Sequence, residues 1–329
     1  MIARDRRHLR FAVFVSLLAA AGGPGPCAAE SAYPTRPVRL LIPFAVGGGS
    51  DTLARIITPK LTDTLGQTWV VDNRGGAGGN LAAEIVVRAA PDGHTVFLGF
   101  NTVLTVNPAL YKLPFDMQRD LAPVTLLATA QYILVLHPGV PAATLGDFIA
   151  YAKLKPGALN FSSGGVGTPL HLSAELFSKR AGIQMVHIAY KGGGPAAAAL
   201  LAGEVQVLFG SVASSMPHVK SGRLKALATT GLKRSKVAPE LPTLAESGFP
   251  GFDVGSWYAL LVPAKTPTAI VNHLRNAAIR TVALPDVQQV MSSQGLEVET
   301  STPRELAARI KRESTVWAWV IKDAGIKAE

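Results

Sequence analysis

The sequence predicts an α/β fold of two doubly wound domains that are joined by two crossing segments. Short apolar runs alternate with longer segments that start at Gly, Ser or Pro, which is the rhythm of a parallel sheet with helices on its faces. This rhythm breaks off near residue 120 and starts again near residue 144. With 329 residues, 48% of them hydrophobic, the chain is long enough for two cores of ordinary size.

Residues 1–29 have the pattern of an export leader and are set apart from the fold. A basic start precedes the apolar run FAVFVSLLAAA, which is too short to span a bilayer, and small residues follow. We expect cleavage after Ala29 and export by the general secretory route, while Arg6-Arg7 leaves twin-arginine export open. The leader also removes Cys27, the only cysteine, so the exported chain can form no disulfide.

The charge of the chain favours small anions over nucleic acid. The formal net charge is +10, of which the four arginines and one aspartate of the leader contribute +3 and the exported chain the remaining +7. Such a field attracts anionic small molecules. The basic residues are scattered and lack interleaved aromatic residues, so we expect no nucleic-acid partner.

The first domain begins with Val38–Leu53, VRLLIPFAVGGGSDTL. This stretch predicts a strand, a glycine turn, and a helix that Ser50 and Asp51 open and Gly66 ends. The elements expected next are strand Trp69–Asn73, the glycine-rich loop Arg74–Asn80, helix Leu81–Ala90 and strand Thr95–Gly99. The order strand–helix–strand–helix–strand predicts a Rossmann-like parallel sheet.

Two apolar runs within Leu121–Leu136 meet at Ala130-Gln131 and are expected to cross into the second domain. That domain is expected to hold helix Thr144–Lys155, strand Leu159–Ser162, helix Pro169–Ala181, strand Met185–Ala189, helix Pro195–Ala202, strand Val205–Phe209, a short helix toward Gly222 and strand Leu224–Thr229. A return strand, Ser256–Val262, leads back to helix Pro267–Leu284, a shorter helix from Asp286, a strand near Leu296–Thr300 and helix Pro303–Ala324. The predicted domains are therefore 30–131 with 256–329, and 132–255.

Five strand-to-helix turns carry open backbone donors, a pattern that favours an anion site. Helix N-termini present unpaired N–H groups and the positive end of the helix dipole. In open α/β sheets, ligands bind beyond the carboxyl ends of the strands, and an anion held from both domains favours their closure. The candidate ligand-binding residues are Ala45, Gly47, Gly48, Ser50 and Asp51; Asn101 and Thr102; Ser162, Ser163, Gly167 and Thr168; Tyr190, Lys191 and Gly192; and Gly210 and Ser211.

Some of these residues have simpler interpretations. Ser50 and Asp51 are good helix caps without any ligand, and Asp51 could hold waters in the site. Lys191 either neutralises a ligand carboxylate or is simply solvated. His171 is expected to pack or hydrogen-bond rather than catalyse. Trp317 and Trp319 are expected to form a docking patch in the core rather than to stack on a ligand.

Enzyme signatures are absent from the sequence. There is no G-x-S-x-G elbow and no Walker A motif. Gly165 and Gly167 begin a dinucleotide fingerprint, but Leu170 stands at its third glycine position. The histidines after the leader show neither H-x-x-x-H nor carboxylate-paired spacing. We therefore expect no catalysis, no cofactor and no metal.

Several longer motifs together resemble one protein family. They are YPTRPVRLLIPFAVGGGSD, VVDNRGGAGGNLAAE, AAPDGHT, HPGVPAATL, FSSGGVGTPLHLSAELF, MVHIAYKGGGPA, LPTLAESGFPGF and AGIKA. The chain resembles the Bug-type periplasmic receptors, the solute-binding proteins of tripartite tricarboxylate transporters. The resemblance implies a type II periplasmic-binding-protein clamshell that holds a small carboxylate through backbone amides and ordered waters. It also implies a periplasmic location and membrane transporter subunits as partners; we expect a monomer.

The chain departs from the family pattern at three places. Val46 stands for the usual proline, and Gly49-Ser50 for the usual Ser/Gly-Thr pair. Gly210-Ser211 replaces a common Asp-Asn, so we expect a dicarboxylate or aromatic carboxylate rather than an amino acid, whose ammonium would need that lost carboxylate. Two alternative functions stay open, a receptor that feeds a sensor kinase and a periplasmic hydrolase on the same fold.

Overall fold

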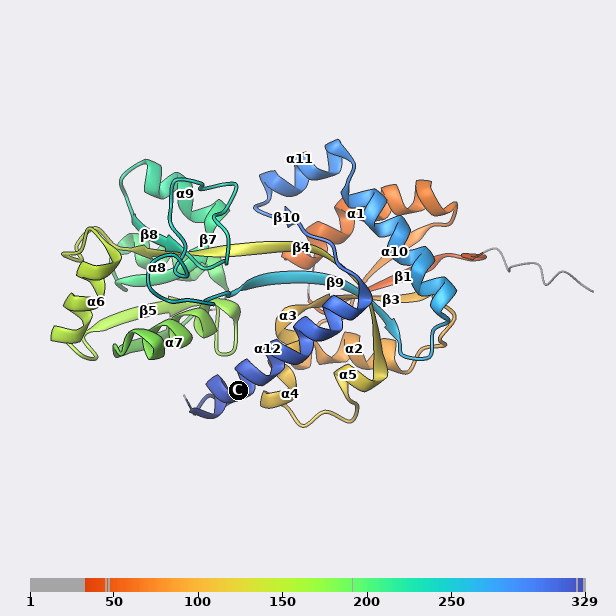
Figure 1. Cartoon of the computed structure of the whole chain (residues 1–329), viewed down its shortest axis with the longest axis horizontal. Coiled ribbons are helices and arrows are strands. Elements are labelled where there is room, and N and C mark those ends of the chain that lie inside the picture. The colour runs from red at the N-terminus through yellow and green to blue at the C-terminus, as the bar shows by residue number, and fades with distance from the viewer. Residues whose placement is uncertain (1–32, 45, 47, 191, 324, 328–329) are drawn as a thin grey trace, which may run out of the picture. The chain divides into compact units, whose positions relative to one another are not determined.

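A computed structural model of the chain describes residues 33–44, 46, 48–190, 192–323 and 325–327. The predicted export leader and the candidate residues Ala45, Gly47 and Lys191 lie outside the described residues. Within them the protein is a mixed α/β structure, which confirms the predicted fold class (Figure 1). The strands are β1 Val38–Ile42, β2 Trp69–Asn73, β3 Thr95–Phe100, β4 Leu121–Leu136, β5 Leu159–Ser163, β6 Met185–Ala189, β7 Val207–Ser211, β8 Lys225–Thr229, β9 Gly255–Pro263 and β10 Glu297–Val298.

The helices match most of the predicted ones in position. They are α1 Gly49–Leu65, α2 Asn80–Val87, α3 Asn101–Thr105, α4 Asn107–Leu110, α5 Met117–Asp120, α6 Leu145–Leu154, α7 Pro169–Ala181, α8 Gly193–Ala202, α9 Val212–Lys220, α10 Thr268–Val282, α11 Pro285–Ser293 and α12 Pro303–Asp323. The short helices α3, α4 and α5 were not expected, because four or five residues are too few to show a 3.6-residue period.

The sheet contains two parallel groups of strands. Strand β1 is parallel to β2 and β3, and β5 is parallel to β6 and β7. Strands β4 and β9 run antiparallel to each other and join the groups, so that the sheet order is β2-β1-β3-β9-β4-β7-β5-β6, with β8 and β10 also paired to β4. Figure 1 shows β4 and β9 running between the two groups. The division into two domains at residues 131/132 and 255/256 stays a prediction.

Strand β4 is continuous, whereas the sequence predicted two strands. Its 16 residues run from one group of strands to the other, with irregular pairing to β9 near Pro123 and Leu126. Ala130 and Gln131, expected at the crossing point, lie within the strand and pair with Ser256 and Gly255. A long strand needs no turn residue to cross, because extended backbone spans about 3.3 Å per residue.

The last helix, α12, packs on both hydrophobic cores. Leu306 and Ile310 belong to the core beside β3 and β9, and Trp317 belongs to the core formed around β5 and α7. Trp317 is buried, as expected for core packing. Trp319 is 49% exposed, and Lys179 Nζ lies 4.3 Å from its ring centroid, so the prediction of a buried docking patch is wrong for this second tryptophan.

Candidate functional site

The register of strand pairing brings the carboxyl ends of both parallel groups to the middle of β4. The end of β3 pairs with the start of β9. The start of β9 also pairs with the middle of β4, and the adjoining residue of β4 pairs with the end of β7. The pairs that establish this are Phe100 with Tyr258, Gly255 with Gln131, and Tyr132 with Ser211. The predicted turns of both halves therefore start from one region of the sheet, which we call the strand junction.

Asn101 lies at this junction with one side-chain atom lacking a partner. The residue is 3% exposed, and its Nδ2 donates a hydrogen bond to the carbonyl of Gly255 at 2.8 Å. That bond fixes the amide, and Oδ1 meets no hydrogen-bond partner among the described residues. A buried acceptor without a donor costs about 1–3 kcal/mol. Asn101 and the buried Thr102 begin helix α3, so the prediction of a turn at these residues is wrong.

The N-terminus of α1 lies against β9. The helix begins at Gly49 with Gly48 as its N-cap, one residue before the predicted opening at Ser50. A Cβ atom on Gly49 would collide with the hydroxyl of Tyr258, so glycine is needed for this close approach. Ser50 and Asp51 are buried in the first turn, and Asp51 Oδ2 accepts a hydrogen bond from Arg55 Nε at 3.0 Å. The Asp51 carboxylate is thus held by Arg55, which lies four residues further along the same helix.

In the second half, the turn that follows β5 is fixed by its own side chains. Ser163 Oγ and Thr168 Oγ1 each donate to the carbonyl of Gly165, at 3.1 and 2.7 Å. Gly167 has a φ of 74°, a left-handed conformation that favours glycine, and a Cβ there would lie 3.1 Å from Leu110 Cδ1 of α4. Ser162 is buried and donates to the carbonyl of Ala196 in α8 at 3.0 Å, so its hydroxyl positions that helix.

Two histidines, His171 and His187, are hydrogen-bonded to residues of this turn. The rings of His171 and His187 stack with their centroids 4.0 Å apart, and His187 also stacks on Phe161. Gly167 N donates to His171 Nδ1 at 3.1 Å, which confirms the expected hydrogen-bonding role of His171. Ser163 Oγ lies 2.6 Å from His187 Nε2. Burial and the neighbouring His171 lower the pKa of His187 to about 4, so its ring is neutral near pH 7.

The pair His171 and His187 corrects the prediction that no histidine has a carboxylate partner. It also bears on the alternative function of a hydrolase. His171 Nε2 lies 3.4 Å from Glu175 Oε1, so a carboxylate-paired histidine is present at a spacing of four residues. The Ser163–His187 pair has the atoms of a nucleophile and a base. The Ser163 side chain is completely buried, however, and therefore presents no nucleophile to a substrate.

The two remaining predicted turns differ from expectation. Helix α8 begins at Gly193, before Pro195, and its N-cap is Gly192. Tyr190 N donates to the carbonyl of Ser163 at 3.0 Å, while its hydroxyl reaches Glu204 Oε2 at 3.4 Å. Gly210 and Ser211 do not form a turn, because they pair with β4 as the last residues of β7. Ser211 is then the N-cap of α9.

The helices that start at the carboxyl ends of these strands have open N-termini. In α1, α7, α8 and α9 no N-cap side chain bonds the first backbone N–H groups. Elsewhere α6 has a complete capping box between Thr144 and Asp147, and α5 is capped by Asp116. Helices α10 and α11 also lack side-chain caps, so an open N-terminus alone is no signal. Helices α2 and α3 lack side-chain caps as well, and they share with the first four a place after a strand of one of the two parallel groups.

Sequence reasoning missed three polar side chains of the crossing strands. Tyr132 of β4 and Ser256 of β9 are buried, and their hydroxyls are hydrogen-bonded to each other. Tyr258 contacts α1 as described above. Burial raises the pKa of Tyr132 to about 12 and also raises that of Tyr258, so both hydroxyls stay protonated. In the sequence these residues lie in apolar runs that read as plain strand, and no local signal marks them.

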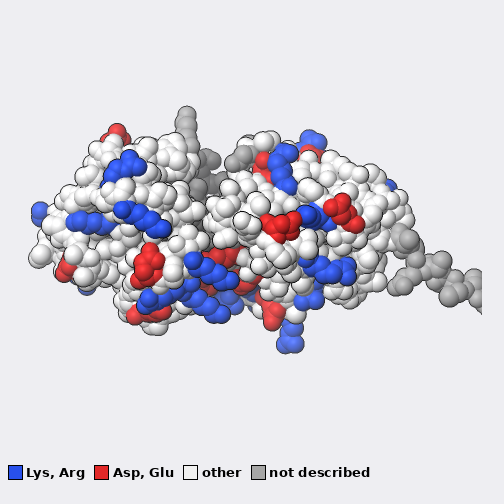
Figure 2. Space-filling view, turned by 90° about the horizontal axis from the view of Figure 1, so that it is seen from above, with Lys and Arg blue, Asp and Glu red and all other residues white. Residues whose placement is uncertain are grey.

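The described residues give no sign of metal or membrane chemistry. Among them no group of three or more His, Cys, Asp and Glu side chains is arranged to hold a metal ion, and none of their helices combines the length and apolarity required to cross a membrane. Figure 2 shows Lys and Arg interspersed with Asp and Glu on the face in view, without a continuous basic band. The expectation that the protein does not bind nucleic acid stays a prediction.

Comparison with known proteins agrees with this fold. BugT of Bordetella pertussis is 35% identical over 321 residues, which cover 96% of this chain and 97% of BugT. The structure of the periplasmic binding protein BugD is 33% identical, with 90% of this chain and 100% of BugD covered and a TM-score of 0.73. MatC of Rhodopseudomonas palustris, solved with bound malate, is 34% identical (88% and 100% covered, TM-score 0.73). An R. palustris protein solved with adipate is 32% identical (90% and 99% covered, TM-score 0.76).

The fold and these relatives place the chain in the class of periplasmic-type solute-binding proteins. Residues 53–326 also match the family model described as "Tripartite tricarboxylate transporter family receptor". The chain therefore belongs to the tripartite tricarboxylate transporter receptor family, and the resemblance in its motifs is confirmed. The similar proteins named above are binding proteins rather than enzymes.

Proposed function

We propose that this protein is an extracytoplasmic receptor that captures a small organic carboxylate at the strand junction and delivers it to a tripartite tricarboxylate transporter. The observation that carries the proposal is the set of open helix N-termini that follow the parallel strands of both groups, because the carboxyl ends of β3 and β7 meet at the strand junction. Backbone N–H groups at such termini bind carboxylates without requiring a counter-cation. The solute-binding role of the family supports the same reading.

The roles of the site residues follow from their positions. Gly48, Ser50 and Asp51, with Gly47 and Ala45 before them, would contact one end of the ligand. Ser163, Gly167 and Thr168 would shape the turn that brings the open N-terminus of α7 to the other end of the ligand, and Lys191 and Gly192 would border the pocket. Asn101 Oδ1, which lacks a partner among the described residues, suits a hydroxyl of the ligand or a bridging water.

We infer a dicarboxylate as the ligand class. Related structures hold adipate and malate, which are both dicarboxylates. The hydroxyls of Tyr132 and Tyr258 at the junction are neutral, because burial raises the pKa of both. Gly210 and Ser211 supply no carboxylate to pair with an ammonium group, which favours a plain or hydroxylated dicarboxylate over an amino acid.

Thermal unfolding of refolded, ligand-free protein against a panel of solutes tests the proposal. The panel contains aliphatic dicarboxylates, citrate, aromatic carboxylates, amino acids and neutral sugars. A ligand at 100 times its Kd should add about 2.7 kcal/mol to the free energy of unfolding. Gly48→Asp should abolish the response, because it adds a second negative charge to the start of α1, next to that of Asp51, where the ligand carboxylate would bind. Gly48→Asn is the matched neutral control, since both residues are good N-caps.

Two results would contradict the proposal. Stabilisation by neutral sugars alone would mean that the open N-termini do not bind anions, and an equal response in Gly48→Asp would place the ligand elsewhere. The partner is tested separately by co-purification with the membrane subunits of a tripartite transporter. Recovery of a sensor kinase in place of those subunits would favour the signalling alternative.

A further inference from the structure

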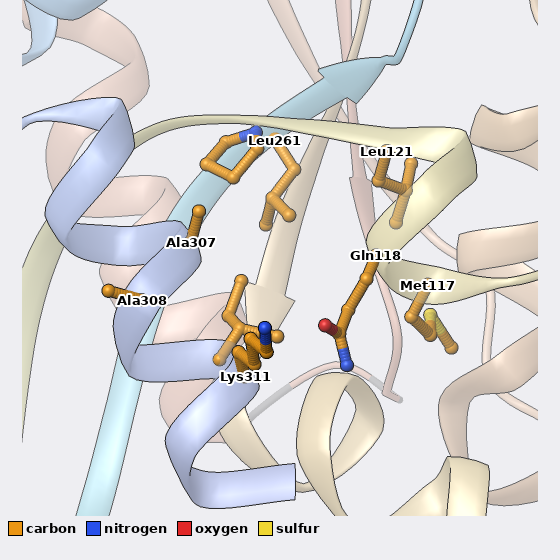
Figure 3. Close-up of a pocket in the computed structure, with 9 residues that line it drawn as sticks. Met117, Gln118, Leu121, Leu261, Ala307, Ala308 and Lys311 are labelled. Carbon is orange, nitrogen blue, oxygen red and sulfur yellow. The ribbon is translucent and has the colours of Figure 1, made fainter.

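A cavity lies at the start of β4, roughly 35 Å along the strand from Tyr132. It has a volume of about 240 Å³ and is bordered by α5, the start of β4, the end of β9 and α12. We call it the α5–α12 groove. Figure 3 shows α12 on one side of the groove and α5, with the start of β4, on the other. None of the candidate residues of the strand junction lines it.

The groove has a closed apolar floor and an open rim. Met117, Leu121, Leu261 and Ile310 are almost fully buried and belong to the core beside β3 and β9. Ala307 forms part of the rim and is exposed. Small residues on α12 thus leave a hollow above the core, and a hollow that is mostly apolar with few polar groups has the form of a small-molecule site.

Two polar side chains stand at the mouth of the groove. Gln118 from α5 and Lys311 from α12 approach it from opposite sides (Figure 3). The ion pairs of α12 join Arg309 to Glu299 and Glu313, and Asp323 to Lys179, and no ion pair in the described part of the chain includes Lys311. Lys311 is a cation beside an apolar cavity, and this combination is complementary to a molecule with an apolar body and one negatively charged end.

We propose that the α5–α12 groove binds a small amphiphilic monocarboxylate, its hydrocarbon body on the Met117–Leu261 floor and its carboxylate between Lys311 and Gln118. A cavity of 150 Å³ accepts benzene, so 240 Å³ holds about ten non-hydrogen atoms, the size of octanoate. A protein partner would need an interface of about 800 Å² on this chain with large apolar anchors around its centre. No large exposed apolar side chain of the described residues lines this groove, and a small molecule fits better.

Calorimetric titration with octanoate tests the proposal, with 1-octanol and acetate as comparison probes. We expect octanoate to bind with a Kd of about 1 mM or tighter, and acetate not to bind measurably. Ala307→Phe fills the groove and should abolish octanoate binding, whereas Ala318→Phe, at an exposed position of the same helix that does not line the groove, should leave it unchanged. Lys311→Gln should weaken octanoate about 2- to 5-fold without affecting 1-octanol, and Lys322→Gln is the matched charge control.

The outcomes separate this groove from the strand junction. If octanoate binding survives Ala307→Phe but is lost in Gly48→Asp, octanoate occupies the junction and the proposal is overturned. Absence of octanoate binding to the unmodified protein at about ten times the expected Kd also overturns it, and leaves the groove to a macromolecular partner. Neither result bears on the dicarboxylate response, which should be the same in Ala307→Phe as in the unmodified protein.

Discussion

The side-chain amide of Asn101 donates a hydrogen bond to the backbone carbonyl of Gly255 at 2.8 Å, across 154 residues of sequence. This bond ties the end of β3 to the start of β9, where the chain returns from the second group of strands. The same side chain keeps an acceptor, Oδ1, without a partner among the described residues. One residue therefore both closes the strand junction and offers it a hydrogen-bond acceptor.

Replacing Asn101 should affect stability and binding together. Asn101→Ala removes the bond to Gly255 and should lower the free energy of unfolding by about 1–2 kcal/mol. It should also reduce affinity for a hydroxylated dicarboxylate such as malate more than for succinate, because only the hydroxyl can donate to Oδ1. Urea unfolding and ligand titration measure the two effects. Equal losses for both ligands would mean that Oδ1 does not contact the hydroxyl.

Acid should weaken the support of the second-half turn through His187. An unfolded histidine takes up its proton near pH 6.5, and the folded His187 only near pH 4, because burial and the adjacent His171 lower its pKa. Between these values the unfolded state binds more protons, so the stability contribution present above pH 6.5 is lost as the pH falls toward 4. The loss should be about 1–3 kcal/mol.

A ring without a titrating nitrogen isolates this effect. His187→Phe keeps the stack on Phe161, and its unfolding free energy should change less between pH 7 and pH 4 than that of the unmodified protein. Urea unfolding at several pH values makes the comparison. Identical pH profiles for the two proteins would show that His187 does not cause the acid sensitivity.

The difference between α6, which has a side-chain N-cap, and α9, which has none, can be tested directly. Thr144→Ala removes the capping box of α6 and should lower the free energy of unfolding by about 1 kcal/mol. Ser211→Ala should change it by less than about 0.5 kcal/mol, because Ser211 makes no side-chain cap bond to α9. A large loss in Ser211→Ala would show that the N-terminus of α9 is capped rather than left open for a ligand.

A buried network holds α12 to the strand junction. Glu313 accepts hydrogen bonds from Trp257 Nε1 and Arg309 Nε, both at 2.8 Å, and burial raises the pKa of this carboxyl group. Glu313→Ala should destabilise the protein by about 2–4 kcal/mol, because it leaves the largely buried Arg309 short of a partner. Glu313→Gln keeps an acceptor for Trp257 and should cost less. Equal denaturant midpoints for the two variants would assign the loss to the charge of Glu313 rather than to its hydrogen bond with Trp257, because both variants remove that charge.

Local patterns in the sequence predicted the alternation of strands and helices and the positions of most turns. Helix α7 and strand β6 begin and end at the predicted residues, because apolar periodicity, Pro169 and Gly182 are local signals that neighbouring residues carry. The motifs also sufficed for the family. The local pattern did not predict that Gly210 and Ser211 pair with β4 as part of β7. Nor did it predict that Asn101 and Thr102 begin the short helix α3.

Which residues meet depends on how the whole chain folds. Tyr132 with Ser256, Gly49 with Tyr258 and Asn101 with Gly255 each join segments more than 100 residues apart, and nothing in either segment marks its partner. These contacts depend on the register of β3, β9, β4 and β7, which is set when whole strand faces pack into the cores. Local propensity fixes the elements, whereas the polar lining of the strand junction arises from long-range pairing that only the folded chain specifies.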